Sequence, residues 1–385
     1  MNHNEEKKTV RVFSLTAFLH DVGSDMVFPF WPFFVTSVLG ASASVLGFLD
    51  GLGDALVSIS QAASGYLSDK TRKRKVFIWL GYLFGAAARV GYAFSFIWQH
   101  LVPFRILDRS GKIRGAPRDA VLADVSTDAN RGKNFGFLHA MDNLGAVCGI
   151  LLALFLVRFL DLRTIFLIAA IPSLLGVLLI IFAIKEAPQS ERKIFKGLSL
   201  AHLTPAFKLF LSLSAIFSLG SFSYSFLLLY VKELGFPIVS MPLFYLLFTA
   251  VAAVAALPFG KLSDRWGRKN IALIGFGFWG LASLTLLLGV PWAAFVALAL
   301  YGLHKGALEP VQRTFVAELA PTEYRASALG GFQMVMGLLA FPSSFLAGVL
   351  WEKVSPAAPF ALSLVLTLIA MVLLLFVRER RETKI

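Results

Sequence analysis

Long apolar stretches separated by short polar segments recur along the whole chain. Most are about 20 residues or longer, which is the length a helix needs to cross roughly 30 Å of hydrocarbon. The pattern predicts an all-α membrane protein with twelve transmembrane helices, over residues 11-38, 42-67, 76-97, 100-123, 134-157, 164-184, 206-231, 237-261, 271-289, 291-318, 327-350 and 357-377. The segments between these spans leave no room for a sizeable soluble domain.

The composition agrees with this pattern and the charge distribution orients it. Apolar residues make up 57% of the chain and charged residues 15%, against roughly 25% charged residues in soluble domains. A net charge of +13 raises the question of a nucleic-acid partner, but most of the 36 Lys and Arg residues fall in loops on one predicted side. The positive-inside rule therefore predicts a multi-pass protein of the bacterial cytoplasmic (inner) membrane with both termini in the cytoplasm. It assigns the basic loops to lipid headgroups rather than nucleic acid.

The two halves of the chain resemble each other at an offset of about 195 residues, as expected of an internal duplication. Gly65 to Lys70 matches Gly260 to Arg265, and Arg118 matches Arg313. The repeat predicts two six-helix bundles, residues 1-184 and 206-385, joined by a cytoplasmic linker over residues 185-205.

The repeated segment resembles the signature of the major facilitator superfamily, Gly-x-x-x-Asp-(Arg/Lys)-x-Gly-(Arg/Lys)-(Arg/Lys). The second copy fits it at Gly260, Asp264, Arg265, Gly267, Arg268 and Lys269. The first copy fits at Gly65, Asp69, Lys70, Lys73 and Arg74, with Arg72 at the position of the signature glycine. A second stretch, from Arg114 to Gly149, is similar to a bacterial subgroup of that superfamily with no assigned substrate. The resemblance implies two pseudo-symmetric bundles that rock about a central site.

The signature also suggests a physical role for its residues. A glycine at the end of a span permits close helix approach, and an Asp at a neighbouring helix N-terminus is stabilised by the helix dipole. We interpret the motif as a gating latch in which the basic residues join the cytoplasmic ends of the two halves, and the alternative is a simple basic anchor. The predicted gating residues are Gly65, Asp69, Lys70, Arg74, Gly260, Asp264, Arg265 and Arg268.

Charged side chains inside the spans are candidate functional residues, because each costs about 2.5 to 3.5 kcal/mol at a helix centre. Asp21 and Asp25 are four residues apart, so their carboxylates share one helix face. Two carboxylates so close resist being ionised together, so one can take up and release a proton. Arg105, Asp108, Arg109 and Lys112 form a polar stripe in the fourth span. We predict that Asp21 or Asp25 pairs with Arg105 or Arg109 as the coupling and binding pair. The alternative is a structural ion-pair network.

Further candidates lie in the fifth and tenth spans. His139 and Asp142 are three residues apart and form either a proton relay or a packed polar cluster. Lys305 and Glu309 have the spacing of an ion pair, and His304 occupies the position that the repeat assigns to Arg109. We interpret Asp50 and Asp54 as inter-helix structural residues, and Arg114 and Arg118 as network or gate residues rather than ligands.

These features predict a secondary active transporter that moves a small organic solute by alternating access. Proton coupling, a monomeric state and the absence of cofactors are part of the prediction. The sequence lacks the phosphate-binding loop of ATP-driven pumps and the common hydrolase motifs, so we predict no enzyme activity. The alternatives are a divalent-metal exporter using His20, Asp21 and Asp25, and a non-transporting receptor on a transporter fold.

Overall fold

A computed structural model describes residues 3–71, 73–127, 130–184, 203–320 and 325–377, so most of the predicted linker lies outside the described residues. In the first half the helices are α1 (His3–Val27), α2 (Trp31–Phe33), the π-helical η1 (Phe34–Val38), α3 (Ala43–Thr71), α4 (Arg74–Ala93), η2 (Trp98–His100), α5 (Leu101–Ser110), η3 (Gly111–Arg114), α6 (Gly115–Val125), α7 (Arg131–Leu156) and α8 (Leu162–Ala183). In the second half they are α9 (Pro205–Gly220), α10 (Tyr224–Glu233), η5 (Ile238–Ser240), α11 (Met241–Trp266), α12 (Arg268–Leu286), α13 (Pro291–Leu319), α14 (Arg325–Lys353) and α15 (Ala358–Leu375).

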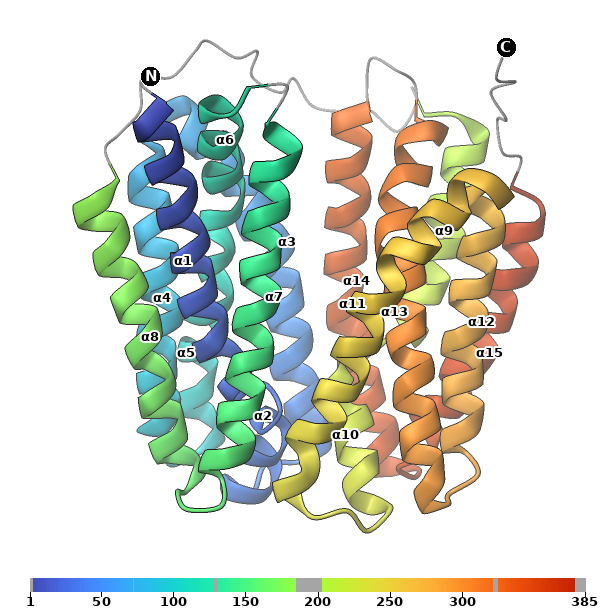
Figure 1. Cartoon of the computed structure of the whole chain (residues 1–385). Helices are drawn as coiled ribbons and strands as arrows, with labels where there is room; N and C mark the ends of the chain where they lie inside the picture. Colours follow the sequence, from blue (N-terminus) through green and yellow to red (C-terminus); the bar gives the residue numbers. More distant parts are fainter. Residues whose placement is uncertain (1–2, 72, 128–129, 185–202, 321–324, 378–385) are drawn as a thin grey trace. The chain divides into compact units, whose positions relative to one another are not determined.

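Every predicted span contains helix, and the prediction of an all-helical membrane fold is confirmed (Figure 1). Within the described residues, 9 helical segments are long and apolar enough to cross a membrane by themselves. The predicted spans that fall short are the first, fourth and tenth, which carry intramembrane charges. Thus the least apolar spans are the ones that carry most of the candidate site residues.

The chain packs as two compact units. The first comprises Met1–Ala41 and Leu56–Phe195, and the second comprises Ser42–Ala55 and Lys196–Ile385. The division therefore falls inside α3, whose first residues pack with the second unit although they belong to the first repeat in sequence.

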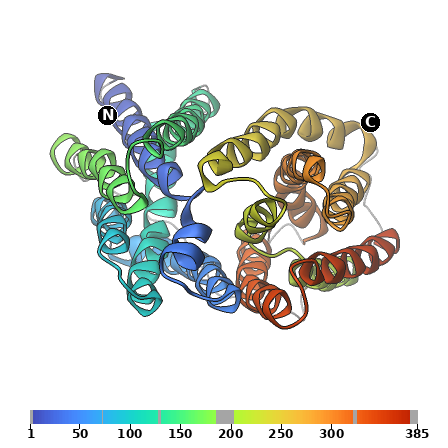
Figure 2. The ribbon, with the colours of Figure 1, turned by 90° about the horizontal axis from the view of Figure 1, so that it is seen from below.

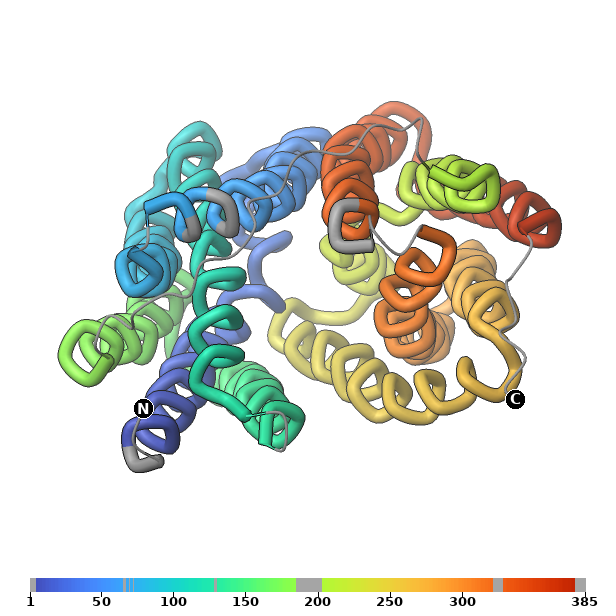
Figure 3. Tube along the Cα trace, turned by 90° about the horizontal axis from the view of Figure 1, so that it is seen from above, coloured from blue at the N-terminus to red at the C-terminus, as the bar shows by residue number. Residues whose placement is uncertain are grey.

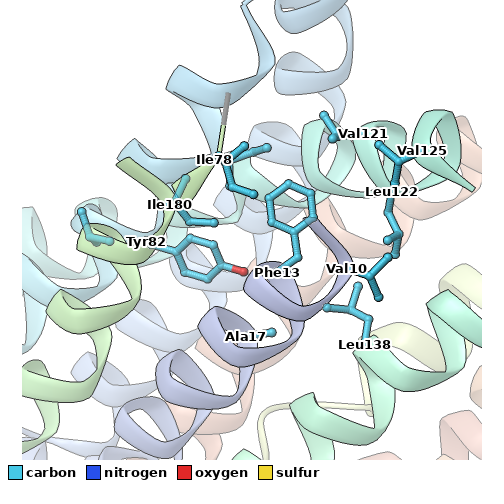
Figure 4. Close-up of a cluster of buried hydrophobic side chains, with 12 residues drawn as sticks. Val10, Phe13, Ala17, Ile78, Tyr82, Val121, Leu122, Val125, Leu138 and Ile180 are labelled. Carbon is cyan, nitrogen blue, oxygen red and sulfur yellow. The ribbon is translucent and has the colours of Figure 1, made fainter. Parts of the chain in front are cut away.

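In the first unit, α1 packs along α7 and α8, and α8 also lies beside α4 (Figure 2). Two glycines of α7 allow it to approach α1 closely. A Cβ built on Gly145 would lie 2.4 Å from the Phe18 carbonyl oxygen, and a Cβ built on Gly149 would lie 2.3 Å from the Val22 carbonyl oxygen. This is the small-residue helix crossing that their four-residue spacing predicts. A cluster of buried apolar side chains lies between α1, α4, α6, α7 and α8 and forms the core of this unit (Figure 4). Phe13 in this cluster is fully buried.

In the second unit, α13 packs against α11 and α12, and α15 packs against α9 and α12 (Figure 3). The α11–α13 crossing again uses glycines, with a Cβ on Gly302 placed 2.6 Å from the Phe248 carbonyl oxygen. The first turns of α3 cross α14 in the same way, since a Cβ on Gly47 would lie 2.1 Å from the Ser344 carbonyl oxygen. The seventh span is interrupted between α9 and α10, where Ser223 caps α10 by accepting from the Ser225 amide at 3.2 Å.

Candidate functional site

The fourth span is broken at its middle. The α-helix α5 gives way to the 3₁₀ turn η3 before α6 begins. At the break η3 lies close to α4. A Cβ built on Gly81 of α4 would lie only 2.5 Å from the Gly111 carbonyl oxygen. A 3₁₀ stretch inside a helical span often marks a functional position, and here the turn carries Lys112 and Arg114.

Asp21 lies on α1, within electrostatic range of the cations at this break. Its side chain is half-buried, and no other described residue lies within hydrogen-bond or ion-pair distance of its carboxylate. The charged residues that act on it electrostatically come from η3, α6 and α7: Lys112, Arg114, Arg118 and Asp142. Asp25, one turn further along α1, is buried with 8% exposure.

Arg118 links α6 to α7. Its Nη1 lies 3.8 Å from Asp142 Oδ1, and its Nε lies 3.1 Å from Asp119 Oδ1. Asp142 also faces His139, whose Nδ1 is 3.7 Å from Asp142 Oδ2 and whose side chain is 65% exposed. The predicted His139–Asp142 pair is therefore extended by an arginine that the sequence marked as a network residue.

The predicted polar stripe of the fourth span is also in place. Arg105 is buried, with its guanidinium carbon 4.2 Å from the centre of the Trp31 ring. The Nε of Arg109 lies 3.6 Å from the Asp108 carboxylate, and its guanidinium lies over the Phe28 ring at 5.4 Å. The predicted pairing of Asp21 or Asp25 with Arg105 or Arg109 stays a prediction.

Arg89 forms a separate, saturated cluster between α1, α4 and α8. It is buried, and its guanidinium donates to the hydroxyls of Ser24 and Ser173 and to backbone carbonyls of α1 and α8. The Nε2 of His20 lies 3.5 Å from Arg89 Nη2. His20 is thus directed at a guanidinium, which is a poor setting for a metal ligand. Among the described residues no group of three or more His, Cys, Asp or Glu is placed to hold a metal ion.

In the second unit, His304 is buried among aromatic rings of α9, α12 and α13. Its Nδ1 lies 2.8 Å from the Gly275 carbonyl oxygen, so the ring joins α13 to α12. This geometry favours a packing role for His304, which the repeat places at the position of Arg109. Lys305 and Glu309 form the ion pair that their spacing predicts, at 3.2 Å.

The signature motif is best described in its second copy. Arg268, the first residue of α12, lies 3.2 Å from Asp264 and also contacts Glu318 near the end of α13. Gly267 has a φ of 90°, a left-handed conformation that favours glycine. Gly260, by contrast, has open space where a Cβ would lie. The expected close helix approach at Gly260 is therefore wrong for this structure, and Arg265 is exposed.

The first copy repeats these contacts within its own unit. Arg74, the first residue of α4, donates to Asp124 at 2.5 Å, as Arg268 does to Glu318. The next residue, Lys75, donates to the Ile181 carbonyl at 2.8 Å. In the second copy Lys269 donates to the Leu375 carbonyl at 2.6 Å.

These contacts correct the alignment of the two copies. They align Arg74 and Lys75 with Arg268 and Lys269, whereas the sequence comparison aligned Lys73 and Arg74 with them. The first copy thus has one more residue between Asp69 and Arg74 than the second copy has between Asp264 and Arg268. The side chains of Gly65 and Asp69 lie outside the described residues, and Lys70 is exposed.

Sequence reasoning placed too little weight on Lys112, Arg114 and Arg118. A usable signal was present in Gly111, Gly115 and Pro117, since clustered Gly and Pro residues within an apolar span predict a break in the helix.

Comparison with known proteins gives one consistent result. The family model of the Major Facilitator Superfamily matches residues 13–255 and 211–385. An uncharacterized MFS-type transporter of Methanocaldococcus jannaschii is 37% identical over 98% of this chain and 96% of its own length. An uncharacterized protein of Mycobacterium tuberculosis is 24% identical over 89% of this chain and 86% of its own length.

Solved structures agree on the fold. A mutant of a peptide transporter superposes with a TM-score of 0.76 at 15% identity, covering 96% of this chain and 93% of that chain. The chain therefore belongs to the Major Facilitator Superfamily of membrane transporters.

Proposed function

We propose that this protein is a secondary active transporter that moves a small organic solute across the cytoplasmic membrane, and that Asp21 carries the coupling proton. One observation carries the proposal: Asp21 is a half-buried carboxylate in the middle of a span, with no hydrogen bond or ion pair of its own among the described residues. Carboxylates within the membrane are costly and occur mainly where they bind ions or protons.

The surroundings of Asp21 give protonation a mechanical consequence. While Asp21 is ionised, it attracts Lys112, Arg114 and Arg118 and repels Asp142. A proton on Asp21 removes these forces together, so the preferred spacing of α1, η3, α6 and α7 changes with the protonation state. A transporter needs such a dependence of conformation on proton binding.

The proposal also includes a proton route to Asp21. His139 is exposed and faces Asp142, which in turn acts on Asp21. Imidazole is the side chain that gains and loses protons most readily near neutral pH. We therefore assign the His139–Asp142 pair to proton delivery.

The proposed orientation has both termini in the cytoplasm. Within the first unit, α1 and α7 begin and α6 ends at the same end (Figure 1). Lys7, Lys8 and Arg11 on α1 and Arg131 and Lys133 on α7 lie toward that end, whereas Arg158 and Arg163 lie near the turn that joins α7 to α8. The larger basic set marks the cytoplasmic end by the positive-inside rule.

The experiment uses purified protein in proteoliposomes that contain a pH-sensitive dye. A panel of small metabolites is added outside, and solute-dependent proton movement is recorded for the native protein, Asp21→Asn and Asp161→Asn. The last variant is a matched control, because Asp161 lies outside the spans, at the start of α8. We expect native protein and control to move protons with at least one solute and Asp21→Asn to have lost this movement. Proton movement that persists in Asp21→Asn, or is absent from native protein with every solute, contradicts the proposal.

A further inference from the structure

The η3 turn carries two cationic side chains, Lys112 and Arg114. Among the described residues, neither Lys112 nor Arg114 has a carboxylate within ion-pair distance. The neighbouring cations differ, because Arg109 has Asp108 and Arg118 has Asp119 and Asp142. Lys112 and Arg114 thus form a pair of cations without carboxylate partners among the described residues, at the break in the fourth span.

The partners that these two side chains do have leave room for a ligand. Arg114 is buried at 7% exposure, with its guanidinium carbon 4.8 Å from the centre of the Tyr82 ring. Its Nη1 donates to the Gly111 carbonyl at 2.8 Å, and within the described part of the chain no other hydrogen bond reaches its guanidinium. Lys112 is half-buried, and its ammonium group makes no hydrogen bond to a described residue. Both side chains thus keep N–H donors for a further acceptor.

The carboxylates near η3 do not balance the charge of the cations around it. Arg89, Lys112 and Arg114 all lack a carboxylate partner among the described residues, and all three lie close enough to interact electrostatically. The carboxylates that act on them are Asp21, which has no ion pair, and Asp108, whose charge is shared with its own partner Arg109. Uncompensated cations at this depth of the membrane are unfavourable, so such a group persists where a counter-ion enters.

We propose that Lys112 and Arg114 bind an anionic group, a carboxylate or a phosphate, of the transported solute. The two side chains suit this ligand, because the guanidinium offers paired N–H donors in one plane and the ammonium offers a point charge with free donors. This inference rests on the proposed transport function and specifies the solute class of that same site.

The same geometry couples the anion to the proton. The charged groups that face Asp21 are Lys112 and Arg114 on η3, Arg118 on α6, Asp142 on α7 and Arg89 on α4. An anion on η3 adds negative charge beside Asp21, so anion binding favours the protonated form of Asp21. By linkage, protonation of Asp21 favours anion binding to the same extent. Proton and anion then travel in the same direction.

The test measures thermal unfolding of the full-length protein in detergent, because a ligand that binds the folded state raises its apparent stability. The probes are matched pairs that differ in charge: succinate with succinamide, and glycerol 3-phosphate with glycerol. Wider pairs of carboxylic acids with their amides, and of phosphate esters with their alcohols, extend the panel. We expect at least one anion to raise Tm while its neutral partner leaves Tm unchanged. The two arms of the panel distinguish a carboxylate from a phosphate.

Variants then locate the site. Lys112→Gln is expected to weaken the apparent affinity for that anion by about tenfold or more, because a charge-assisted hydrogen bond is lost. Lys112→Arg retains the charge and is expected to retain most of the affinity, which keeps the test decisive if the Gln variant folds poorly. Lys133→Gln is the matched control, since Lys133 is exposed at the start of α7.

Several results would overturn the inference. These are a panel in which no anion raises Tm, neutral partners that stabilise as well as the anions, and a Lys112→Gln variant with unchanged affinity. Failure here is distinct from failure of the proposed function, since a neutral solute that drives proton movement through Asp21 would refute the anion site and leave proton-coupled transport intact.

Discussion

Arg74 and Asp124 form an ion pair at 2.5 Å that ties the first residue of α4 to the end of α6. The corresponding residues of the second half, Arg268 and Glu318, are also in contact. Each pair lies inside its own unit. In both copies the arginine thus fastens two helices of its own bundle, and the latch between bundles stays a prediction.

The first prediction concerns this pair. Arg74 is 3% exposed and Asp124 is 23% exposed, so Arg74→Ala leaves a carboxylate without its main counter-charge in a poorly solvated position. We expect a loss of about 3 kcal/mol in the free energy of unfolding, measured as a lower Tm and a lower denaturant midpoint in detergent. Lys73→Ala is the control, because Lys73 is exposed next to Arg74, and it should change stability by less than about 0.5 kcal/mol. Equal effects of the two substitutions would show that the ion pair is unimportant.

The α1–α7 crossing gives the second prediction. A Cβ on Gly149 would lie 2.3 Å from the Val22 carbonyl oxygen, and backbone cannot move aside as a flexible side chain can. Gly149→Ala should therefore separate α1 from α7 and cost about 1 to 3 kcal/mol. Gly136→Ala lies in the same helix with open space around the new methyl group, and should be neutral or stabilising by up to about 1 kcal/mol. Thermal unfolding of the two variants side by side decides the matter, and a stable Gly149→Ala protein would rule out the tight crossing.

Most of the spans were predictable because they are long apolar runs with polar ends. Helix ends were predicted less closely, since α11 ends at Trp266 and α12 begins at Arg268, whereas the spans predicted there end at residue 261 and begin at residue 271. What the pattern could not show is which helix each span packs against, because that depends on contacts between residues far apart in sequence. The packing of the start of α3 with the second unit is the clearest case, as Gly47 and Gly51 meet α14 there.

The candidate site was predictable in part. Charge within a span identified Asp21, Asp142 and Lys305, because the cost of burying a charge holds in any fold. The partners were harder to predict. His304 looked available by its position in the repeat but is packed between rings and bonded to the Gly275 carbonyl. Lys112 appeared to be one cation in a stripe, and its lack of a carboxylate becomes visible only when the ion pairs of its neighbours are known.

A pH dependence is expected at the start of α8. Asp161 caps this helix, accepting from the Arg163 amide at 3.2 Å and from the Thr164 hydroxyl at 2.5 Å. The Thr164 hydrogen bond lowers the pKa of Asp161 below its ordinary value. A lowered folded-state pKa means that the stabilisation is complete above the unfolded-state pKa and is lost as the pH falls through the folded-state pKa. The window therefore lies on the acid side of about 4.

Asp161→Asn tests this directly, because asparagine also caps helices but carries no charge. We expect the Tm difference between native protein and this variant to be constant at neutral pH and to shrink as the pH falls through that window. Asp161→Ala should cost about 1 kcal/mol at neutral pH through loss of the cap. A Tm difference that grows on acidification would contradict the assignment.

The last prediction concerns Asp50 and Ser223, which join the start of α3 to the break in the seventh span. Asp50 is 1% exposed, and its Oδ2 accepts from the Ser223 hydroxyl at 2.7 Å. The same hydroxyl caps α10, so the carboxylate sits at the positive end of a helix dipole, which stabilises it. Either Asp50→Ala or Ser223→Ala breaks this arrangement, and each should lower the free energy of unfolding by about 1 to 2 kcal/mol.

Because both substitutions remove the same contact, the double variant should be less destabilised than the sum of the single variants by at least about 0.5 kcal/mol. A second double-mutant cycle uses Ser212→Ala as the control, because Ser212 lies on the exposed side of α9. In this cycle the losses in the free energy of unfolding from Ser212→Ala and Asp50→Ala should be additive. Additivity in both cycles would mean that the Asp50–Ser223 hydrogen bond does not hold α3 in the second unit.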